Sequence, residues 1–210
     1  MSIIINNVSK SIKKTMILEN INIELKYNNI YGIYGKNGSG KSVFLKLITG
    51  IYKPTSGIIT IDDIDYNKND YFPIKMGALI ESPSFLNDLT GFQNLKLLAD
   101  LQNKIMEDEI NQALKLVSLY EEKDKKYNEY SLGMKQKLGI AQVLMENPNI
   151  IILDEPFNGL EDDTITNLIK YLKSIKKDKI ILITSHNKKL LNNVSDKMLI
   201  LEDKQIKELK

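Results

Sequence analysis

The chain opens with an alternation of apolar and polar residues. Residues 3–8 and 21–26 follow this period of two, which is typical of half-exposed strands in an antiparallel layer. Lys13 and Lys14 fall in the connection between them. Continuous apolar runs then predict further strands at 30–35, 58–61 and 76–80.

The spacing changes from about Phe85 to Tyr130, where apolar residues recur three and four positions apart and strand signals vanish. An acidic, Asn-rich turn at 62–70 precedes this region, and a predicted helix from Leu132 to about Asn147 follows it. We therefore expect a helical subdomain at approximately 85–147, inserted between two halves of an α/β pattern.

An alternating order of strands and helices returns after the insertion. Residues 150–153 form a continuous apolar run, which is typical of a parallel strand covered on both faces. The remaining pattern predicts helix 161–176, strand 180–184, a short helix near 187–193, and strands 198–202 and 205–209. This order indicates an α/β fold, which we expect to form one domain over residues 1–210.

Composition narrows the class of protein without naming a function. Hydrophobic residues make up 42% and charged residues 27%, as in ordinary soluble globular proteins. The absence of cysteine excludes disulfides and thiolate metal sites, and a net charge of +2 gives no reason to expect a nucleic-acid partner. Because residues 1–6 lack the features of a signal peptide and no run is long enough to span a membrane, we expect a cytoplasmic protein.

The first candidate for chemistry is the segment 35–42, which fits G-x-x-x-x-G-K-[ST] between a predicted strand and a predicted helix. Glycines let the backbone turn its N–H groups toward an anion, Lys41 can reach the β- and γ-phosphates of a nucleotide, and Ser42 can help hold Mg²⁺. A glycine-rich turn that matches by chance is the alternative. The nucleotide contacts predicted here are Gly35, Asn37, Gly38, Ser39, Gly40, Lys41, Ser42 and Val43.

The second candidate is Asp154-Glu155-Pro156, which ends an apolar strand. At the carboxyl edge of a parallel sheet, Asp154 lies on the same side as the phosphate loop and can orient the Mg²⁺ shell. Glu155 can then orient or deprotonate the attacking water. An ordinary strand end with a solvated acidic turn is the alternative, and the phosphate loop earlier in the chain makes it the weaker one.

Four segments together resemble the main motifs of the nucleotide-binding domain of ABC transporters. They are 35–42, 130–136, 154–156 and 183–186, in the order and spacing of that family. The resemblance implies a P-loop NTPase of the ABC ATPase type, with a mixed β core, an antiparallel β edge and a helical insertion in a RecA-like core. It also implies ATP and Mg²⁺ as cofactors and a pair of subunits that enclose two ATP molecules.

Residues 130–134 resemble the LSGGQ signature, whose helix faces the ATP held by the other subunit. Leu132 and Met134 depart from this pattern, whereas Ser131 and Gly133 match it and are carried over as nucleotide contacts. A helix start attracts phosphate through its free N–H groups and its dipole. Ser131 could equally serve only as the N-cap of the following helix.

His186, the chain's one histidine, matches the family's switch histidine, which contacts the γ-phosphate; a surface histidine at a helix start is the alternative. The segment 157–161 resembles the D-loop, with Glu161 in place of the usual aspartate. As an acid in the first turn of a helix, Glu161 would also complement the helix dipole.

Glu81 stands where most family members carry glutamine, so the resemblance implies a catalytic role beside Mg²⁺ or the attacking water and a hinge for the insertion. A surface glutamate near Pro83 is the alternative. The segments 77–85 and 88–91 are similar to the branch that exports, or gives immunity to, lantibiotics and peptide antibiotics such as bacitracin. Ile12 or Ser11 stands where many members carry the aromatic residue that stacks on adenine, so selectivity for ATP over GTP stays open.

The resemblance implies an ATPase subunit that binds the inner face of the cell membrane through a separate permease, paired with a second ATPase subunit. Export of a peptide antibiotic or another amphipathic compound is the expected activity, with segment 85–130 as the docking surface. The alternative is a non-transport ABC-type ATPase that acts on a soluble or nucleic-acid partner. Those proteins usually carry long coiled-coil insertions or tandem ATPase domains, for which 210 residues leave no room. A P-loop kinase or GTPase would leave the 131–133 segment unexplained.

Overall fold

The computed structural model describes residues 2–65, 75–102 and 105–209. Part of the acidic turn expected at 62–70 therefore lies outside the described residues. Two sheets and their helices make up the described structure, in the mixed α/β architecture that the motifs imply. Among the described residues, no helix combines the length and the apolar character needed to span a lipid bilayer.

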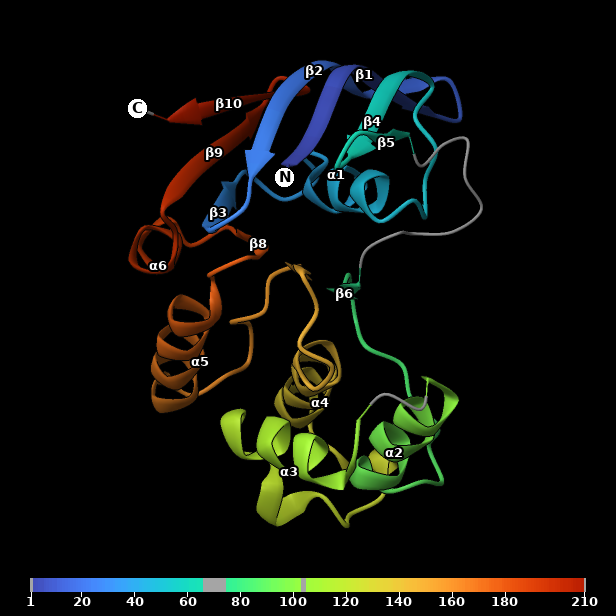
Figure 1. Ribbon diagram of the computed structural model, residues 1–210, viewed down its shortest axis with the longest axis vertical. Coiled ribbons are helices and arrows are strands. Elements are labelled where there is room, and N and C mark those ends of the chain that lie inside the picture. The colour runs from blue at the N-terminus through green and yellow to red at the C-terminus, as the bar shows by residue number, and fades with distance from the viewer. Residues whose placement is uncertain (1, 66–74, 103–104, 210) are drawn as a thin grey trace.

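A four-stranded antiparallel sheet lies at one end of the molecule (Figure 1). Its order is β2-β1-β4-β5, where β1 is Ser2–Ile12, β2 is Thr15–Lys26, β4 is Ser56–Ile61 and β5 is Ile64–Asp65. The first two strands are longer than the sequence predicted, and only Lys13 and Lys14 separate them. The register between β1 and β2 is irregular after Ile5. This breaks the alternation of apolar and polar residues, so the sequence predicted strands that were too short.

A six-stranded sheet forms the centre, in the order β10-β9-β3-β8-β7-β6. Its strands are β3 (Asn29–Tyr34), β6 (Met76–Leu79), β7 (Ile150–Leu153), β8 (Ile180–Ser185), β9 (Lys197–Glu202) and β10 (Gln205–Leu209). All neighbours are parallel except β10, which pairs antiparallel with β9. The parallel strands therefore bring their carboxyl ends to one edge, as the motif positions required.

Helices cover both faces of the central sheet. They are α1 (Lys41–Ile48), α4 (Leu132–Leu144), α5 (Asp162–Ile175) and α6 (Lys188–Val194). The inserted region adds α2 (Gly91–Gln102), α3 (Glu107–Leu116) and the short 3₁₀ turns Tyr120–Glu122 and Tyr127–Glu129. Figure 1 shows α2 and α3 at the end of the molecule opposite the antiparallel sheet, with α4 between them and the central sheet. Residues 91–129 thus contain helices and 3₁₀ turns, in the range where the spacing of apolar residues predicted helices.

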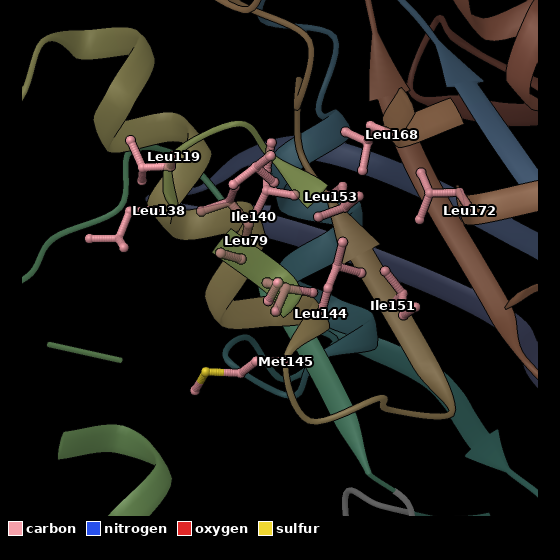
Figure 2. Close-up of a cluster of buried hydrophobic side chains, with 14 of the residues drawn as sticks. Leu79, Leu119, Leu138, Ile140, Leu144, Met145, Ile151, Leu153, Leu168 and Leu172 are labelled. Carbon is pink, nitrogen blue, oxygen red and sulfur yellow. The ribbon is translucent and has the colours of Figure 1, made fainter. Parts of the chain in front are cut away.

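Strand β7 shows why its continuous apolar run was informative. Ile151 and Leu153 belong to the core cluster that α4 and α5 cover, whereas Ile150 and Ile152 belong to the cluster on the side of α1 and the antiparallel sheet. Figure 2 shows Ile151 and Leu153 among leucines of α4 and α5. Each fully buried aliphatic side chain of this kind contributes about 1.5–3 kcal/mol of transfer free energy. The strand that precedes Asp154 is thus fixed from both faces.

Candidate nucleotide site

The phosphate loop runs from the end of β3 to the start of α1. Gly38 and Gly40 have φ angles of 78° and 105°, in the left-handed region that favours glycine. A Cβ on Gly35 would lie 2.6 Å from the Ser39 Oγ and 2.8 Å from the Leu201 carbonyl oxygen. No side chain caps the start of α1, so the first N–H groups of this helix are free for an anion.

Lys41 lies at the mouth of this loop, and its side chain is only 7% exposed. Its ammonium donates hydrogen bonds to the carbonyl oxygens of Gly35, at 2.8 Å, and Lys36, at 3.3 Å, and lies 3.5 Å from Glu155 Oε1. The buried Ser39 hydroxyl has no hydrogen-bond partner within the described part of the chain. A buried ammonium beside an unpartnered hydroxyl suits an anionic ligand such as a phosphate.

Asp154 is brought against the phosphate loop, as its place at the end of β7 predicted. The Ser42 hydroxyl donates to Asp154 Oδ2 at 2.6 Å, and the Thr184 hydroxyl donates to Asp154 Oδ1 at 2.5 Å. Hydroxyl and carboxylate oxygens are ligands that Mg²⁺ accepts, so Ser42 and Asp154 fit this ion. No cluster of three or more His, Asp or Glu side chains suited to a metal is found within 2–65, 75–102 and 105–209. Mg²⁺ would therefore need oxygens of the nucleotide as well.

Glu155 and His186 also lie together. The His186 Nδ1 is 3.0 Å from Glu155 Oε2, and the His186 backbone N–H donates to the same oxygen at 3.3 Å. Glu155 has a φ of 48°, in the left-handed region, which costs a non-glycine residue roughly 1–2 kcal/mol. Its buried Oε1 accepts no hydrogen bond from the described residues and faces the Lys41 ammonium at 3.5 Å.

Glu81 lies at the rim of the site rather than on Asp154. Its side chain is 62% exposed, and its carboxylate forms an ion pair with Lys46 of α1. The hydrogen bond from this pair raises the pKa of Lys46, and the Asp154 charge adds a smaller contribution. Glu81 and Asp154 thus both raise the pKa of Lys46, although the structure shows no contact between the two carboxylates.

The Ser131 hydroxyl caps α4 by accepting a hydrogen bond from the Met134 N–H at 3.2 Å. This is the N-cap that the sequence left open as an alternative. Among the described residues, no hydrogen bond joins Ser131 to the phosphate loop of the same chain. A Cβ on Gly133 would lie 2.5 Å from the Gly159 carbonyl oxygen, so the signature and the 157–161 segment touch closely.

Two further contacts tie α4 to the segment after β7. Gln136 Nε2 donates to the Glu155 carbonyl oxygen at 3.4 Å, and the buried Lys137 ammonium lies 2.7 Å from Glu161 Oε2. The Lys137 hydrogen bond is the main cause that lowers the pKa of Glu161. Glu161 is also the N-cap residue of α5, directly before the first turn in which the sequence placed it, and its side chain makes no capping hydrogen bond.

The structure also places the two positions that depart from common family residues. Ile12 ends β1 at the turn beside Lys13, and the neighbouring Ile17 packs 3.2 Å from the position of a Cβ on Gly40. Val43 is half-buried against the core, so its side chain serves packing. Lys46, Lys137 and Thr184 were missed as site residues; only Thr184 gave a signal, as a polar residue that follows an apolar run.

Comparison with known proteins adds the deciding observation. Residues 18–158, well over half of the chain, match the family described as ABC transporter. The chain belongs to the ABC transporter family. Its ATP-binding cassette has the fold of a dimeric cassette, MJ0796, solved in a post-hydrolysis state with ADP and Pi (TM-score 0.88, 26% identity, 99% of this chain and 98% of that one).

Curated relatives of this ABC cassette are transport ATP-binding proteins. The bacitracin transport protein BcrA of Enterococcus faecalis is 34% identical over 96% of this chain and 67% of its own length. The lantibiotic transport protein SrtF of Streptococcus pyogenes is 36% identical over 87% of this chain and 79% of its own. The chain is therefore an ATP-hydrolysing subunit of the ABC transporter kind, and the resemblance to the bacitracin and lantibiotic branch is confirmed.

Proposed function

We propose that this subunit drives export of a peptide antibiotic, or of another amphipathic compound, through a separate membrane-spanning permease. The observation that carries the proposal is the similarity to bacitracin and lantibiotic transport proteins over most of the chain. The protein would bind the inner face of the membrane only through that permease. One domain over residues 1–210, with a helical subdomain inserted at about 85–147, is part of the proposal.

In the proposed reaction, the phosphate loop binds the ATP phosphates through backbone N–H groups, and Lys41 neutralises their charge. Ser42 and Asp154 would hold Mg²⁺, which supplies further neutralisation of the charge that develops during phosphoryl transfer. Glu155 orients or deprotonates the attacking water with its carboxylate, whose Oε1 lies 3.5 Å from the Lys41 ammonium and whose Oε2 contacts His186. Glu81 would join them from the rim of the site.

The working unit proposed is a pair of cassettes, with Ser131 and Gly133 of one copy contacting the ATP of the other. Solved dimers of the MJ0796 cassette support this arrangement. Within one chain Ser131 has no hydrogen bond to the phosphate loop among the described residues, and this agrees with a role of Ser131 toward a second copy. The first turn of α4 contains no acidic side chain, which suits this contact with phosphate.

The proposed docking surface for the permease is the outer side of α2 and α3. Leu97, Leu101 and Met106 are 43%, 76% and 78% exposed there. Met106 also lines a cavity of about 590 Å³, together with apolar Ala99, Ile105 and Ile110 and with charged side chains. Exposed apolar side chains around a hollow are common at protein–protein interfaces.

Co-expression tests the proposal. The chain would be produced with the membrane protein of the neighbouring reading frame, and resistance to bacitracin and to a lantibiotic measured against the matched variant Lys41→Ala. We expect co-purification with the membrane protein and resistance that Lys41→Ala removes. Purification with a soluble partner instead, and resistance unaffected by Lys41→Ala, would favour the non-transport alternative.

Pairing needs a separate test. Ser131→Arg places a large side chain at the helix start that is proposed to face the second ATP, so it should block ATP-driven dimerisation while each monomer still binds ATP. Light scattering in the presence of ATP measures this dimerisation, with Ser131→Arg introduced into a hydrolysis-deficient variant. Ser131→Thr keeps the capping hydroxyl and is the matched control. Unchanged dimerisation of Ser131→Arg would count against the paired site.

A further inference from the structure

Thr184 is a buried hydroxyl at the end of an otherwise apolar strand. It lies on β8 after Ile180–Ile183, and its side chain is 0% exposed. A hydroxyl in such surroundings is unfavourable unless its hydrogen bonds are made. The partners of this hydroxyl therefore show what the residue does at this position.

The Thr184 hydroxyl joins the two neighbouring acidic residues of the site. It donates to Asp154 Oδ1 at 2.5 Å and accepts from the Glu155 backbone N–H at 2.9 Å. Ser42 donates to the other oxygen, Asp154 Oδ2. The Asp154 carboxylate is thus held at both oxygens, and its rotation about the last side-chain bond is prevented by two hydroxyl groups from different elements.

The second bond acts on the backbone of Glu155. That residue takes a left-handed φ of 48°, which L-residues adopt only where the surroundings hold them. The bond from its N–H to Thr184 is one such restraint, and it sets the direction in which the Glu155 side chain leaves the strand. From there the carboxylate reaches His186 and Lys41.

We infer that Thr184 is a positioning residue for ATP hydrolysis. Its hydroxyl orients the Asp154 carboxylate for Mg²⁺ and fixes the backbone turn that aims Glu155 at the water. The inference rests on the proposed Mg²⁺–ATP site. Groups that orient metal ligands or catalytic carboxylates from behind change activity or metal affinity by roughly 10–100-fold when they are removed.

Thr184→Val tests the inference because valine keeps the shape of threonine and removes only the hydroxyl. We expect turnover to fall roughly 10–100-fold and KM for Mg²⁺–ATP to rise, because the Asp154 carboxylate is held less well for the metal. Affinity for a fluorescent ATP analogue, measured with Mg²⁺ and with EDTA, gives a readout that does not depend on turnover. Mg²⁺ should tighten binding to the wild type and tighten it much less in Thr184→Val, while the affinity in EDTA is the same for both.

Thr184→Ser is the matched variant, since it keeps the hydroxyl, and it should retain most of the turnover and the Mg²⁺ effect. Wild-type turnover and a wild-type Mg²⁺ effect in Thr184→Val would overturn the inference. Equal losses in the serine and valine variants would also overturn it, because the hydroxyl would not be the cause. If Mg²⁺ fails to tighten binding even to the wild type, the proposed metal site itself is wrong.

Discussion

The Lys46 ammonium and the Glu81 carboxylate form an ion pair that joins α1 to the segment after β6. Lys46 belongs to the helix that begins at the phosphate loop, and Glu81 begins the connection to the helical insertion. Glu81 has a φ of 64°, so its backbone also takes an unusual conformation at this point. The pair therefore gives a direct link between the nucleotide site and the insertion proposed to dock the permease.

Loss of this carboxylate should affect catalysis more than stability. Because Glu81 is 62% exposed, we expect Glu81→Ala to change the free energy of unfolding by no more than about 1 kcal/mol. If Glu81 acts beside the metal or the water, turnover should fall by roughly 10–100-fold. Denaturant titration and ATPase assays measure the two effects. Glu19→Ala, at an exposed glutamate on the antiparallel sheet, controls for the change of charge. Normal turnover in Glu81→Ala would leave Glu81 a surface residue.

Glu155→Gln should separate binding from hydrolysis. The amide keeps the shape of the side chain but cannot take a proton from water, so turnover should fall by roughly 10²–10⁴-fold. Affinity for ATP should be retained, because the phosphate loop supplies the binding contacts. Equilibrium binding and steady-state assays test this against Asp163→Asn, which removes an exposed acid of α5. Turnover near that of the wild type would remove Glu155 from its proposed role.

The central parallel strands could be predicted because their sequence and surroundings agree. Residues 150–153 are apolar without interruption, and the structure buries alternate residues of this strand in two different cores. The hairpin of β1 and β2 was predicted only in part, since its bulges break the period of two. The two-residue strand β5 is too short to give any pattern.

The site was predictable to the extent that single motifs carry it. Local sequence is enough to recognise segment 35–42 and the carboxylates after β7. The parallel strands then bring Ser42 and Asp154 together. The ion pair of Lys46 with Glu81 joins residues 35 positions apart on elements whose relative placement no local pattern gives. Tertiary packing decides which charges meet, so the partner of Glu81 had to come from the structure.

Gly133→Ala should disturb the contact between the start of α4 and the 157–161 segment. The added Cβ would lie 2.5 Å from the Gly159 carbonyl oxygen, so one backbone has to move. We expect ATP-driven dimerisation and turnover to fall while a monomer still binds ATP at its own phosphate loop. Light scattering and nucleotide titration measure these effects. Leu132→Ala, which shortens a side chain that is 77% exposed, is the fold control; dimerisation of Gly133→Ala at the wild-type level would contradict the prediction.

Tyr130 fixes the approach to the signature, and its effect on stability should depend on pH. Its hydroxyl donates to the Glu122 carbonyl oxygen at 2.9 Å, and its side chain is 4% exposed. Burial is the main cause that raises the pKa of Tyr130 to about 12, against about 10 in the unfolded chain. The folded state therefore holds this proton more tightly, and the stability this gives is present below pH 10 and is lost between about pH 10 and 12.

Tyr130→Phe removes both the hydrogen bond and this titration. At pH 8 the variant should be less stable than the wild type by about 1 kcal/mol, because the Glu122 carbonyl loses its donor. At pH 11 the wild type should have lost about 1 kcal/mol through ionisation of the unfolded tyrosine, so the two proteins should become nearly equal. The lysines titrate in both proteins, and their effect cancels in the difference. Urea unfolding at the two pH values measures the difference in the free energy of unfolding between the two proteins. A difference that stays constant from pH 8 to pH 11 would show that this tyrosine does not hold its proton as its burial requires.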